Sequence, residues 1–548
     1  MSGQGSGFRG GIRAKMAAAQ ANREFELKFK AQPKDLQRFK RAVNAAGKNR
    51  RAWPKKTMVS RYFDTEDLRL RALGVSVRLR DNGEETVQTI KARAGNGGGF
   101  MDRHEWERVV DGDALVLTDL PIAARRAIGA VRDDELGVVM EVHIERQSMV
   151  IRRTNPLGPD VVIEAVADIG RIVAGEREET FAECELELVE GDVNAFFTAA
   201  SEIHNACPLP LSSLTKAGRG YRLLSGDGPK AHRVPKFALS GEQTIHQALS
   251  EIYPVCIANI IDNEEACLDG TDPEGVHQMR VSVRRLRTSL KVFGDYMDPA
   301  RTAWMADDLK WLGNALGPAR DWDVYITEML ETVAGYGVDA AAVEVLHTAA
   351  EARRAAAYEK VRKTLTSRRY AKMMFHLTAF VAVEGWLAMP LDPSNPLLRP
   401  LEICAGDILA KPHRKLLKQA RNLEAQDMEA RHEVRIRIKK LRYAVDFLRG
   451  VYPGKQTAKY VKSLQSLQDQ FGHLNDVAQA MNMTSALTTS DDPARERTLA
   501  LAGGLIQGWY ARALKETEPQ LLKDWKKFTK VQPFWLTPAG ADSVNKPS

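Results

Sequence analysis

The sequence predicts a multidomain α+β protein in which an antiparallel β domain is followed by an all-α domain. The chain has 548 residues, which corresponds to about two to four domains at roughly 100 to 200 residues each. Before about residue 225, short runs alternate apolar and polar residues with period two, as strands do. After it, apolar residues recur three and four positions apart, as on one face of a helix.

Composition excludes several classes of protein. Hydrophobic residues make up 44% and charged residues 27%, which is typical of folded globular domains and excludes global disorder. No run approaches the roughly 18 to 20 apolar residues of a membrane helix, and the first 23 residues contain no apolar signal-peptide core. We therefore expect a cytosolic protein without a membrane partner.

The cysteines and the net charge give weaker indications. Five widely spaced cysteines without a CxxC pair argue against disulfides and a thiolate zinc site: Cys184, Cys207, Cys256, Cys267 and Cys404. We expect them to be reduced core residues. The net charge of +8 (79 basic minus 71 acidic residues) fits an anionic partner without requiring one.

A linker separates the two predicted domains. Residues 225–237 begin with SGDGPKAHRVPK, a stretch rich in glycine, proline and basic residues. We expect a flexible N-terminal segment at 1–21, a β domain at 22–224, a helical domain at 238–530 and a C-terminal tail at 531–548.

Charged side chains gather on one face of each predicted strand. In residues 24–30 (EFELKFK) the charged residues share one face, because successive side chains alternate across a strand. The split recurs at 76–80 (SVRLR), 88–93 (QTIKAR) and 183–190 (ECELELVE). One interpretation is an open sheet with its polar face in water. The other is a closed sheet whose ionic faces line a lumen, which the clustered like charges favour because they would repel one another on an open face.

A closed sheet would divide the lumen into two sectors. A basic sector suited to phosphates would contain Lys28, Arg78, Arg80 and Lys91. An acidic sector suited to Mg²⁺ or Mn²⁺ would contain Glu24, Glu26, Glu185 and Glu187. The combination indicates metal-assisted phosphoryl chemistry.

An ordered set of motifs resembles the CYTH domain of the triphosphate tunnel metalloenzymes. Glu24, Glu26 and Lys28 form an ExExK signature. Further segments follow in that family's order: RYFDT at 61–65, VSVRLR at 75–80, QTIK at 88–91, EWE at 105–107, ADIG at 167–170, ECELE at 183–187 and SSLTKAGRGY at 212–221. The resemblance covers residues 22–224. It implies an eight-stranded antiparallel tunnel barrel that hydrolyses short triphosphates with bound Mg²⁺ or Mn²⁺.

The same resemblance implies roles for individual residues. Those implied to neutralise phosphate oxygens are Lys28, Arg61, Arg78, Arg80, Lys91, Lys216 and Arg219. Those implied to hold metal or orient water are Glu24, Glu26, Asp168, Glu185 and Glu187, with Glu24, Glu26 and Lys28 as the catalytic set. Further candidates are Lys30, Arg93, Glu105, Glu107 and Glu183. Asp168, Lys216 and Arg219 also have structural interpretations, as a turn cap and as a solvated helix end.

The helical half contains an internal duplication. Residues 277–287 (HQMRVSVRRLR) match 432–442 (HEVRIRIKKLR) at an offset of 155, and GPARD at 317–321 matches GHLND at 472–476 at the same offset. In each copy a histidine and three basic residues fall on one helical stripe: His277, Arg280, Arg284 and Arg287, then His432, Arg435, Lys439 and Arg442. Each stripe is either a solvated face or part of a polyanion site.

The duplicated pattern resembles the CHAD domain over residues 238–530. This resemblance implies a pair of four-helix bundles whose basic residues bind inorganic polyphosphate, including on polyphosphate granules. Basic clusters at 368–372 and 413–421 are further candidates for the anion track. The two histidines lack a nearby HxxxH partner, so a phosphate contact or a core hydrogen bond is favoured over metal ligation.

The sequence-based conclusion is a bacterial inorganic triphosphatase that cleaves tripolyphosphate to pyrophosphate and phosphate and binds polyphosphate through its helical domain. One alternative keeps the barrel but changes the substrate to thiamine or nucleoside triphosphates, or changes the reaction to adenylate cyclisation. Another is a non-catalytic polyphosphate-binding protein. A nucleic-acid binder ranks last, because neither basic stripe carries the interleaved aromatic residues that base stacking requires.

Overall fold

The computed structural model describes residues 23–48, 52–93, 98–156, 158–336, 339–387, 392–489 and 492–536. The predicted segment 1–21 and residues 537–548 of the predicted tail lie outside this range. The chain divides into two compact units. The first is Met1–Lys230 together with Thr366–Val383, and the second is Ala231–Leu365 together with Glu384–Ser548.

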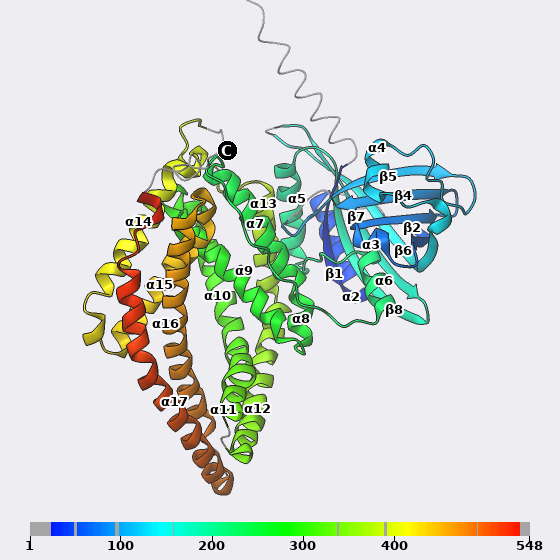
Figure 1. The fold of residues 1–548 in the computed structure, drawn as a ribbon. Coiled ribbons are helices and arrows are strands. Elements are labelled where there is room, and N and C mark those ends of the chain that lie inside the picture. Colours follow the sequence, from blue (N-terminus) through cyan, green and yellow to red (C-terminus); the bar gives the residue numbers. More distant parts are fainter. Residues whose placement is uncertain are drawn as a thin grey trace, which may run out of the picture. The chain divides into compact units, whose positions relative to one another are not determined.

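The first unit is built on a closed antiparallel barrel, which confirms the predicted fold class (Figure 1). Its strand order around the barrel is β1-β5-β4-β3-β2-β6-β7-β8. The strands are β1 Arg23–Ala31, β2 Lys55–Asp64, β3 Val75–Asp81, β4 Thr86–Arg93, β5 Met101–Val110, β6 Gly137–Arg153, β7 Val161–Ala174 and β8 Arg177–Glu190. β1 closes the barrel by pairing with β5 on one side and β8 on the other.

Short helices cover the barrel. They are α2 Pro33–Ala46, α3 Arg69–Ala72, α4 Ile122–Ile128, the 3-10 turn η1 Asp133–Glu135, α5 Val193–Ala206 and α6 Lys216–Ser225. The same unit includes α13 Arg368–Ala382, although its sequence lies in the middle of the predicted helical domain. This membership rests on packing of α13 against α5.

Helix α6 begins where its sequence provides a cap. The Thr215 hydroxyl accepts a hydrogen bond from the Gly218 amide, so Lys216 becomes the first helical residue. A Cβ atom at Gly220 would lie 2.0 Å from the Met140 sulfur. Only glycine therefore lets α6 approach β6 this closely, and the close approach carries Lys216 to the barrel interior.

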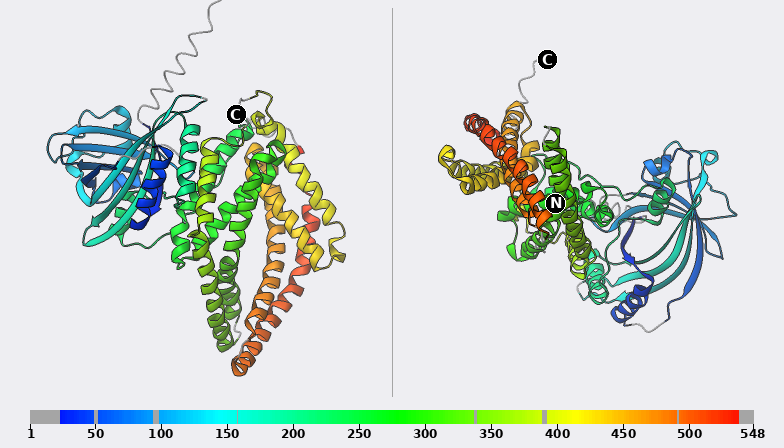
Figure 2. Two further views of the ribbon diagram at one scale, coloured as in Figure 1. Left: turned by 180° about the vertical axis from the view of Figure 1, so that it is seen from behind. Right: turned by 90° about the horizontal axis from the view of Figure 1, so that it is seen from below.

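The second unit is helical. Its helices are α7 Ile245–Asp262, α8 Glu264–Asp269, α9 Pro273–Val292, η2 Gly294–Tyr296, α10 Pro299–Val324, the π-helical η3 Tyr325–Leu330, α11 Glu331–Gly335, α12 Ala340–Leu365, η4 Pro396–Leu398, α14 Leu401–Gln419, η5 Leu423–Ala425, α15 Met428–Leu448, η6 Arg449–Val451, α16 Lys455–Leu487, α17 Pro493–Phe528 and η7 Phe534–Leu536. The last two long helices, α16 and α17, pack side by side as a hairpin (Figures 1 and 2).

The sequence duplication reappears as repeated helices. α9 begins at Pro273 and α15 at Met428, which preserves the offset of 155 residues (428−273). Asp272 and Asp427 cap these helices by accepting hydrogen bonds from backbone amides in the first turn. The two helices also contact each other.

Two further features concern the cysteines and the apolar character of the helices. All five cysteines lie within the described ranges, where they are buried and form no disulfide. In the part of the chain that the structure describes, no helix has both the length and the apolar character needed to span a bilayer.

Candidate functional site

The register of the strands determines which side chains enter the barrel lumen. On β1 and β8, Glu26 lies opposite Glu187 and Lys28 lies opposite Glu185. Directly opposed residues project from the same face of a sheet. The period-two charge pattern of the sequence therefore marks the lumen-facing side of these strands, and the glutamates of β8 lie against the ExExK motif of β1.

One wall of the lumen is a compact network of buried ion pairs. The Lys28 ammonium contacts Glu185, and its Nζ lies 3.3 Å from Glu183 Oε1 and 3.9 Å from Glu26 Oε1. Burial alone would lower the pKa of Lys28, but Glu183, Glu185 and Glu26 raise it well above its ordinary value. Lys28 is therefore a fixed positive charge in the lumen.

A second lysine and an arginine complete this network. The Lys216 ammonium contacts Glu183 and lies 2.9 Å from Asp168 Oδ2. Arg146 donates two hydrogen bonds to Asp168, from Nε at 2.9 Å and from Nη2 at 2.8 Å. Its Nη2 also lies 3.2 Å from Glu185 Oε2. Asp168 is fully buried, so its charge is offset by partners rather than by water.

Replacing Asp168 by asparagine is expected to destabilise the barrel by about 3 kcal/mol, because Arg146 and Lys216 would lose a buried counter-charge. Burial favours a raised pKa at Asp168, but Lys216 and Arg146 hold that pKa below its ordinary value. The stability that this carboxylate contributes is therefore present above the ordinary aspartate pKa and is lost as pH falls through the lower folded-state pKa. Urea unfolding at neutral pH measures the effect.

The exposed pair of Arg61 and Asp113 provides the control for that experiment. Asp113 is 75% exposed at its side chain, and its replacement by asparagine should cost less than about 1 kcal/mol. Equal losses of unfolding free energy in the two variants would contradict the structural role given to Asp168.

Glu24, Glu26 and Glu187 form a second carboxylate cluster, whose negative charges repel one another. Burial, followed by the charges of Glu24 and Glu26, raises the pKa of Glu187 to about 8, and Glu164 contributes in the same direction. Burial is the largest cause of this rise, repulsion by the neighbouring carboxylates adds to it, and the Lys91 ammonium opposes it. A divalent cation bound among these oxygens would offset their negative charge.

The acidic residues fit a hard divalent metal. Asp168, Glu183 and Glu185 each offer a carboxylate oxygen within 4.8 Å of the others. Within the described ranges, Glu183 Oε2 is buried and has no hydrogen-bond partner. Among the described residues, this trio has carboxylate oxygens close enough together to hold a metal ion, whereas Glu24, Glu26 and Glu187 are linked by the register of β1 with β8 and by the raised pKa of Glu187.

The opposite wall of the lumen is basic. The register places Tyr62 opposite Arg78 and Ser60 opposite Arg80, so all four side chains face the lumen. Arg78 Nη1 lies 3.5 Å from the Tyr62 hydroxyl. Burial, followed by the charges of Arg78 and Arg146, lowers the pKa of Arg80 to about 10. Mutually repelling guanidinium groups in a confined space form a site that an anion would stabilise.

Hydrogen-bond donors without partners lie on the same wall. Among the described residues, Nε of Arg78 and of Arg80 on this wall is buried and has no hydrogen-bond partner, and the same holds for Nε of Arg219 on α6, beside Glu179 of β8. An unmade hydrogen bond of a buried charged group is costly. A phosphate oxygen in the lumen would supply the missing acceptor, so these atoms indicate an oxyanion ligand.

The other predicted site residues of the barrel lie beside these two walls. Lys91 bridges them, with Nζ 2.7 Å from Glu24 Oε2 and 3.0 Å from Glu105 Oε1. Glu107 accepts a hydrogen bond from Thr89, and Arg219 donates to Glu179 at 3.2 Å. Lys30 lies opposite Glu183 on β8, whereas Arg93 is exposed.

Arg61 does not join the predicted phosphate set. The register pairs it with Leu79 and Glu141, so it projects from the face opposite to Tyr62 and Arg78. Its guanidinium contacts Asp113 at 2.5 Å. The structure therefore corrects the prediction for this residue, because adjacent residues of one strand cannot both face the lumen.

Sequence reasoning missed two lumen residues. Arg146 and Glu164 were not selected, although they face Asp168 and Glu187 across the sheet. The signal was weak, because Arg146 shares its strand face with the apolar Val142 and Ile144 and follows a pattern typical of a core face.

In the helical unit, the basic stripes of α9 and α15 come together. The Arg284 guanidinium lies 5.5 Å from the centre of the Tyr443 ring. Burial, followed by the charges of Arg435 and Arg284, lowers the pKa of Lys439 to about 8, and Arg280 adds to the effect. Cations from both sequence repeats are therefore close enough to repel one another.

A large basic cavity includes three residues of these stripes, Arg284, Arg287 and Lys439. Its volume is about 660 Å³, and its cationic lining comes from three helices: Arg284, Arg287 and Lys291 of α9, Lys411, Arg414 and Lys415 of α14, and Arg437, Lys439 and Lys440 of α15. The two acidic lining residues are Asp295 and Asp407. Arg414 and Lys415 of the second basic cluster in the sequence, at 413–421, thus line this cavity.

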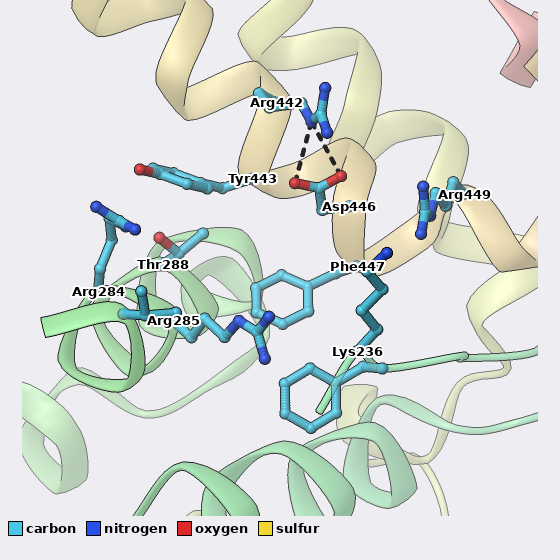
Figure 3. A pocket seen from close by; sticks show the side chains of 11 residues that line it. Lys236, Arg284, Arg285, Thr288, Arg442, Tyr443, Asp446, Phe447 and Arg449 are labelled. Atoms are coloured by element: carbon cyan, nitrogen blue, oxygen red, sulfur yellow. Dashed lines mark hydrogen bonds and ion pairs between the residues drawn. The ribbon is translucent and has the colours of Figure 1, made fainter. Parts of the chain in front are cut away.

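A smaller cavity of about 250 Å³ shares Arg284, Thr288 and Tyr443 with the large one (Figure 3). In it, Arg442 Nε donates to both carboxylate oxygens of Asp446, at 3.0 and 3.1 Å. Arg442 is therefore partly neutralised by an acid of its own helix, whereas its repeat counterpart Arg287 lines the large cavity.

The two stripe histidines differ from each other. His277 is half-buried, and burial followed by the charge of Arg320 lowers its pKa below the ordinary value, so its ring is neutral at neutral pH. His432 is exposed. Arg280 donates a hydrogen bond to the Gly313 carbonyl at 3.1 Å, and burial lowers the pKa of Arg435.

Comparison with known proteins identifies two domain families. The family model of the CYTH domain matches residues 22–221, and that of the CHAD domain matches residues 252–484. Two Mycobacterium tuberculosis proteins, MT2285 and Rv2226, both named as uncharacterized, are 26% identical over 426 residues, which is 74% of this chain and 78% of each relative.

Solved structures match each part of the chain. The CHAD domain of the plant Ricinus communis is 29% identical and covers 56% of this chain and 98% of its own length, with a TM-score of 0.47. The Hippeastrum protein HpAC1, described with a dominant triphosphatase activity, is 17% identical and covers 37% of this chain and 96% of its own, with a TM-score of 0.28.

Proposed function

The chain belongs to the proteins that join a CYTH domain to a CHAD domain, and from this premise we propose that its barrel is a metal-dependent inorganic triphosphatase. The proposed reaction cleaves tripolyphosphate to pyrophosphate and phosphate. The observation that carries the proposal is the division of one lumen into a wall of closely spaced carboxylates and a guanidinium wall with unpartnered donors.

The basic wall would bind the phosphate chain. Arg78 and Arg80 project from β3, and Lys91 projects from the neighbouring β4. An incoming triphosphate would accept hydrogen bonds from the free Nε atoms and offset the repulsion between the guanidinium groups. Without such fixed cations, the loss of hydration would keep a multiply charged anion out of a buried lumen.

The acidic wall would hold Mg²⁺ or Mn²⁺ through Glu24, Glu26 and Glu187, with Asp168 and Glu185 as the other predicted ligands. A divalent cation there would polarise the scissile phosphoryl group and acidify the attacking water. Lys28 lies between the two carboxylate clusters, 3.9 Å from Glu26 and in contact with Glu185. Its ammonium would orient these carboxylates and stabilise negative charge that develops on the phosphoryl oxygens.

For the helical unit we propose binding of inorganic polyphosphate in the cavity lined by α9, α14 and α15. Its lining, with nine cationic side chains against two acidic ones, suits a polyanion. The five cysteines are buried and form no disulfide, which is compatible with our proposal that the protein lies in the cytosol.

Polyphosphate affinity is expected to fall by about tenfold between pH 7 and pH 9, at constant ionic strength. The free protein loses the Lys439 proton near pH 8, whereas a bound phosphate favours the ammonium form and raises that pKa. Binding therefore takes up a proton, and it weakens as pH rises through about 8. Isothermal titration at several pH values measures the dependence. Lys439→Met should flatten it, and an unchanged pH profile in that variant would assign the effect to another group.

A substrate panel tests the proposed reaction. Phosphate release is measured from tripolyphosphate, ATP, thiamine triphosphate and long-chain polyphosphate, each with Mg²⁺, Mn²⁺ or chelator. The proposal predicts metal-dependent release from tripolyphosphate above all other substrates. Faster phosphate release from a nucleoside triphosphate or thiamine triphosphate would assign a different substrate to the barrel but the same class of reaction. Polyphosphate binding without phosphate release from any substrate would show that the protein binds polyphosphate but is not a triphosphatase.

A further inference from the structure

The back of the catalytic strand rests on aromatic side chains of α5. Phe25 and Phe29 lie on the outward face of β1, between the lumen-facing charged residues. The Phe25 ring centre lies 5.5 Å from that of Phe196 and 6.0 Å from that of Phe197, both edge-on. Phe29 stacks on His204 at 5.7 Å. The outward side chains of β1 therefore pack on α5.

Helix α13 covers the other side of these α5 residues. Phe375 is fully buried, and its ring stacks on His204 with centroids 4.3 Å apart and planes inclined by 9°. It also contacts Phe197 at 6.2 Å. Burial lowers the pKa of His204 to about 4, so the imidazole is neutral and packs as an aromatic ring. Phe375, His204 and Phe29 thus form a continuous stack from α13 to β1.

The segment after α5 ties this stack to the backbone of β1. His204 Nε2 lies 3.0 Å from the Leu209 carbonyl oxygen. The next residues pair with the strand, because the Lys30 amide donates to the Pro210 carbonyl and the Ser212 amide donates to the Lys28 carbonyl, both at 2.8 Å. A displacement of His204 would therefore be transmitted to the backbone of Lys28.

A second contact joins α13 to the loop before β5. The Thr378 hydroxyl donates a hydrogen bond to the Gly98 carbonyl at 2.9 Å, and both groups are buried. Phe100 of this loop lies 4.5 Å from Phe25, ring centre to ring centre. Two independent contacts thus connect α13 to the outward face of β1.

We propose that α13 is the outer support of the catalytic strand and that Phe375 is a positioning residue for the barrel reaction. This inference rests on the proposed function of the barrel. Because side chains alternate across a strand, fixing Phe25 and Phe29 also fixes Glu24, Glu26 and Lys28 on the other face. A segment from the helical half of the sequence thereby becomes part of the machinery that aligns the metal-binding carboxylates.

The test replaces Phe375 by alanine in the full-length protein. Misplacement of catalytic groups by about 1 Å can cost up to about 100-fold in rate. We expect kcat for tripolyphosphate to fall about tenfold and the Mn²⁺ concentration for half-maximal activity to rise about fivefold. The KM for tripolyphosphate should stay within about twofold, because β3 and β4 carry the basic wall. Phe375→Leu should restore most of the loss.

Controls separate positioning from general destabilisation. Phe528→Ala removes an equally buried ring from the helical unit and should leave kcat and metal dependence unchanged. Thr378→Val removes the hydrogen bond to Gly98 with little change of shape and should produce a smaller effect of the same kind. Wild-type kcat and Mn²⁺ dependence in folded Phe375→Ala, or the same losses in Phe528→Ala, would overturn the inference.

Hydrogen exchange keeps the inference testable if the wild-type barrel proves inactive. That result would overturn the proposed function, but the structural link would still predict faster amide exchange across residues 23–31 and weaker Mn²⁺ binding in Phe375→Ala. Unchanged exchange and unchanged Mn²⁺ affinity in that variant would overturn the link itself.

Discussion

Replacing Glu26 by glutamine is expected to lower metal-dependent phosphate release by about 100-fold or more in kcat/KM. Glu26 is 4% exposed, faces the lumen opposite Glu187 and contributes to the raised pKa of that residue. Glutamine has nearly the same shape but lacks the charge that a divalent cation requires. The pKa of Glu187 should therefore fall in the metal-free variant, because one repelling charge is gone. Steady-state kinetics across a Mn²⁺ titration measures the loss.

Glu190→Gln is the matched control for this variant. Glu190 ends the same strand as Glu187, but its side chain is 64% exposed and lies 3.6 Å from Arg152. Its replacement should leave both kcat and the Mn²⁺ midpoint unchanged. If Glu26→Gln kept wild-type kinetics at every Mn²⁺ concentration, the carboxylate cluster would not be the metal site.

Replacing Arg80 by methionine is expected to change substrate affinity and stability in opposite directions. Hydrogen bonds to charged groups contribute about 1.5 to 3 kcal/mol, so KM for tripolyphosphate should rise about 10-fold to 100-fold. The ligand-free protein should gain stability from this replacement, because Arg80 is repelled by Arg78 and Arg146 and its Nε lacks a hydrogen-bond partner among the described residues. Replacing such a buried charge by an apolar side chain is often neutral or stabilising.

Thermal unfolding without ligand and initial-rate kinetics test the two halves of this prediction. The melting temperature of Arg80→Met should equal or exceed that of the wild type, while added tripolyphosphate should stabilise the variant less. Arg152→Met, which removes an exposed arginine from β6, should change neither KM nor the response to ligand. A large loss of stability with an unchanged KM would show that Arg80 serves the fold rather than the substrate.

The lumen was predictable from sequence wherever charges recur with period two. Glu24, Glu26 and Lys28, together with Glu185 and Glu187, follow that pattern, and the register brings them together. Arg61 was misplaced because family motifs identify positions but not strand faces. Only the pairing of Tyr62 with Arg78 shows which of the two adjacent residues points inward.

The helical site was predictable to a similar degree. The duplication located α9 and α15, and Arg284, Arg287 and Lys439 of the two predicted stripes line one cavity, while the role of the stripes in anion binding stays a prediction. The contact between Arg284 and Tyr443, and the participation of Arg414 and Lys415 of α14, depend on helix packing that the sequence pattern does not encode. The pairing of Arg442 with Asp446 could have been found, since residues four apart on a helix are neighbours.

The place of α13 could not be predicted from the sequence. Its stacking on α5 joins Phe375 to His204, which lie 171 residues apart (375−204). An amphipathic helix pattern shows that an apolar face exists but not which partner covers it. The predicted domain boundaries therefore assign α13 to the helical domain, although it packs against α5 of the barrel unit.

The most direct test of the central claim is the release of phosphate from tripolyphosphate by the wild-type protein, with Mn²⁺ or Mg²⁺ and then with excess chelator. A metal-dependent triphosphatase should release one phosphate per tripolyphosphate, leave pyrophosphate as the second product and lose its activity when the chelator is added. The absence of release under all conditions, or release that the chelator does not affect, would contradict the assignment of the lumen as a metal-dependent active site.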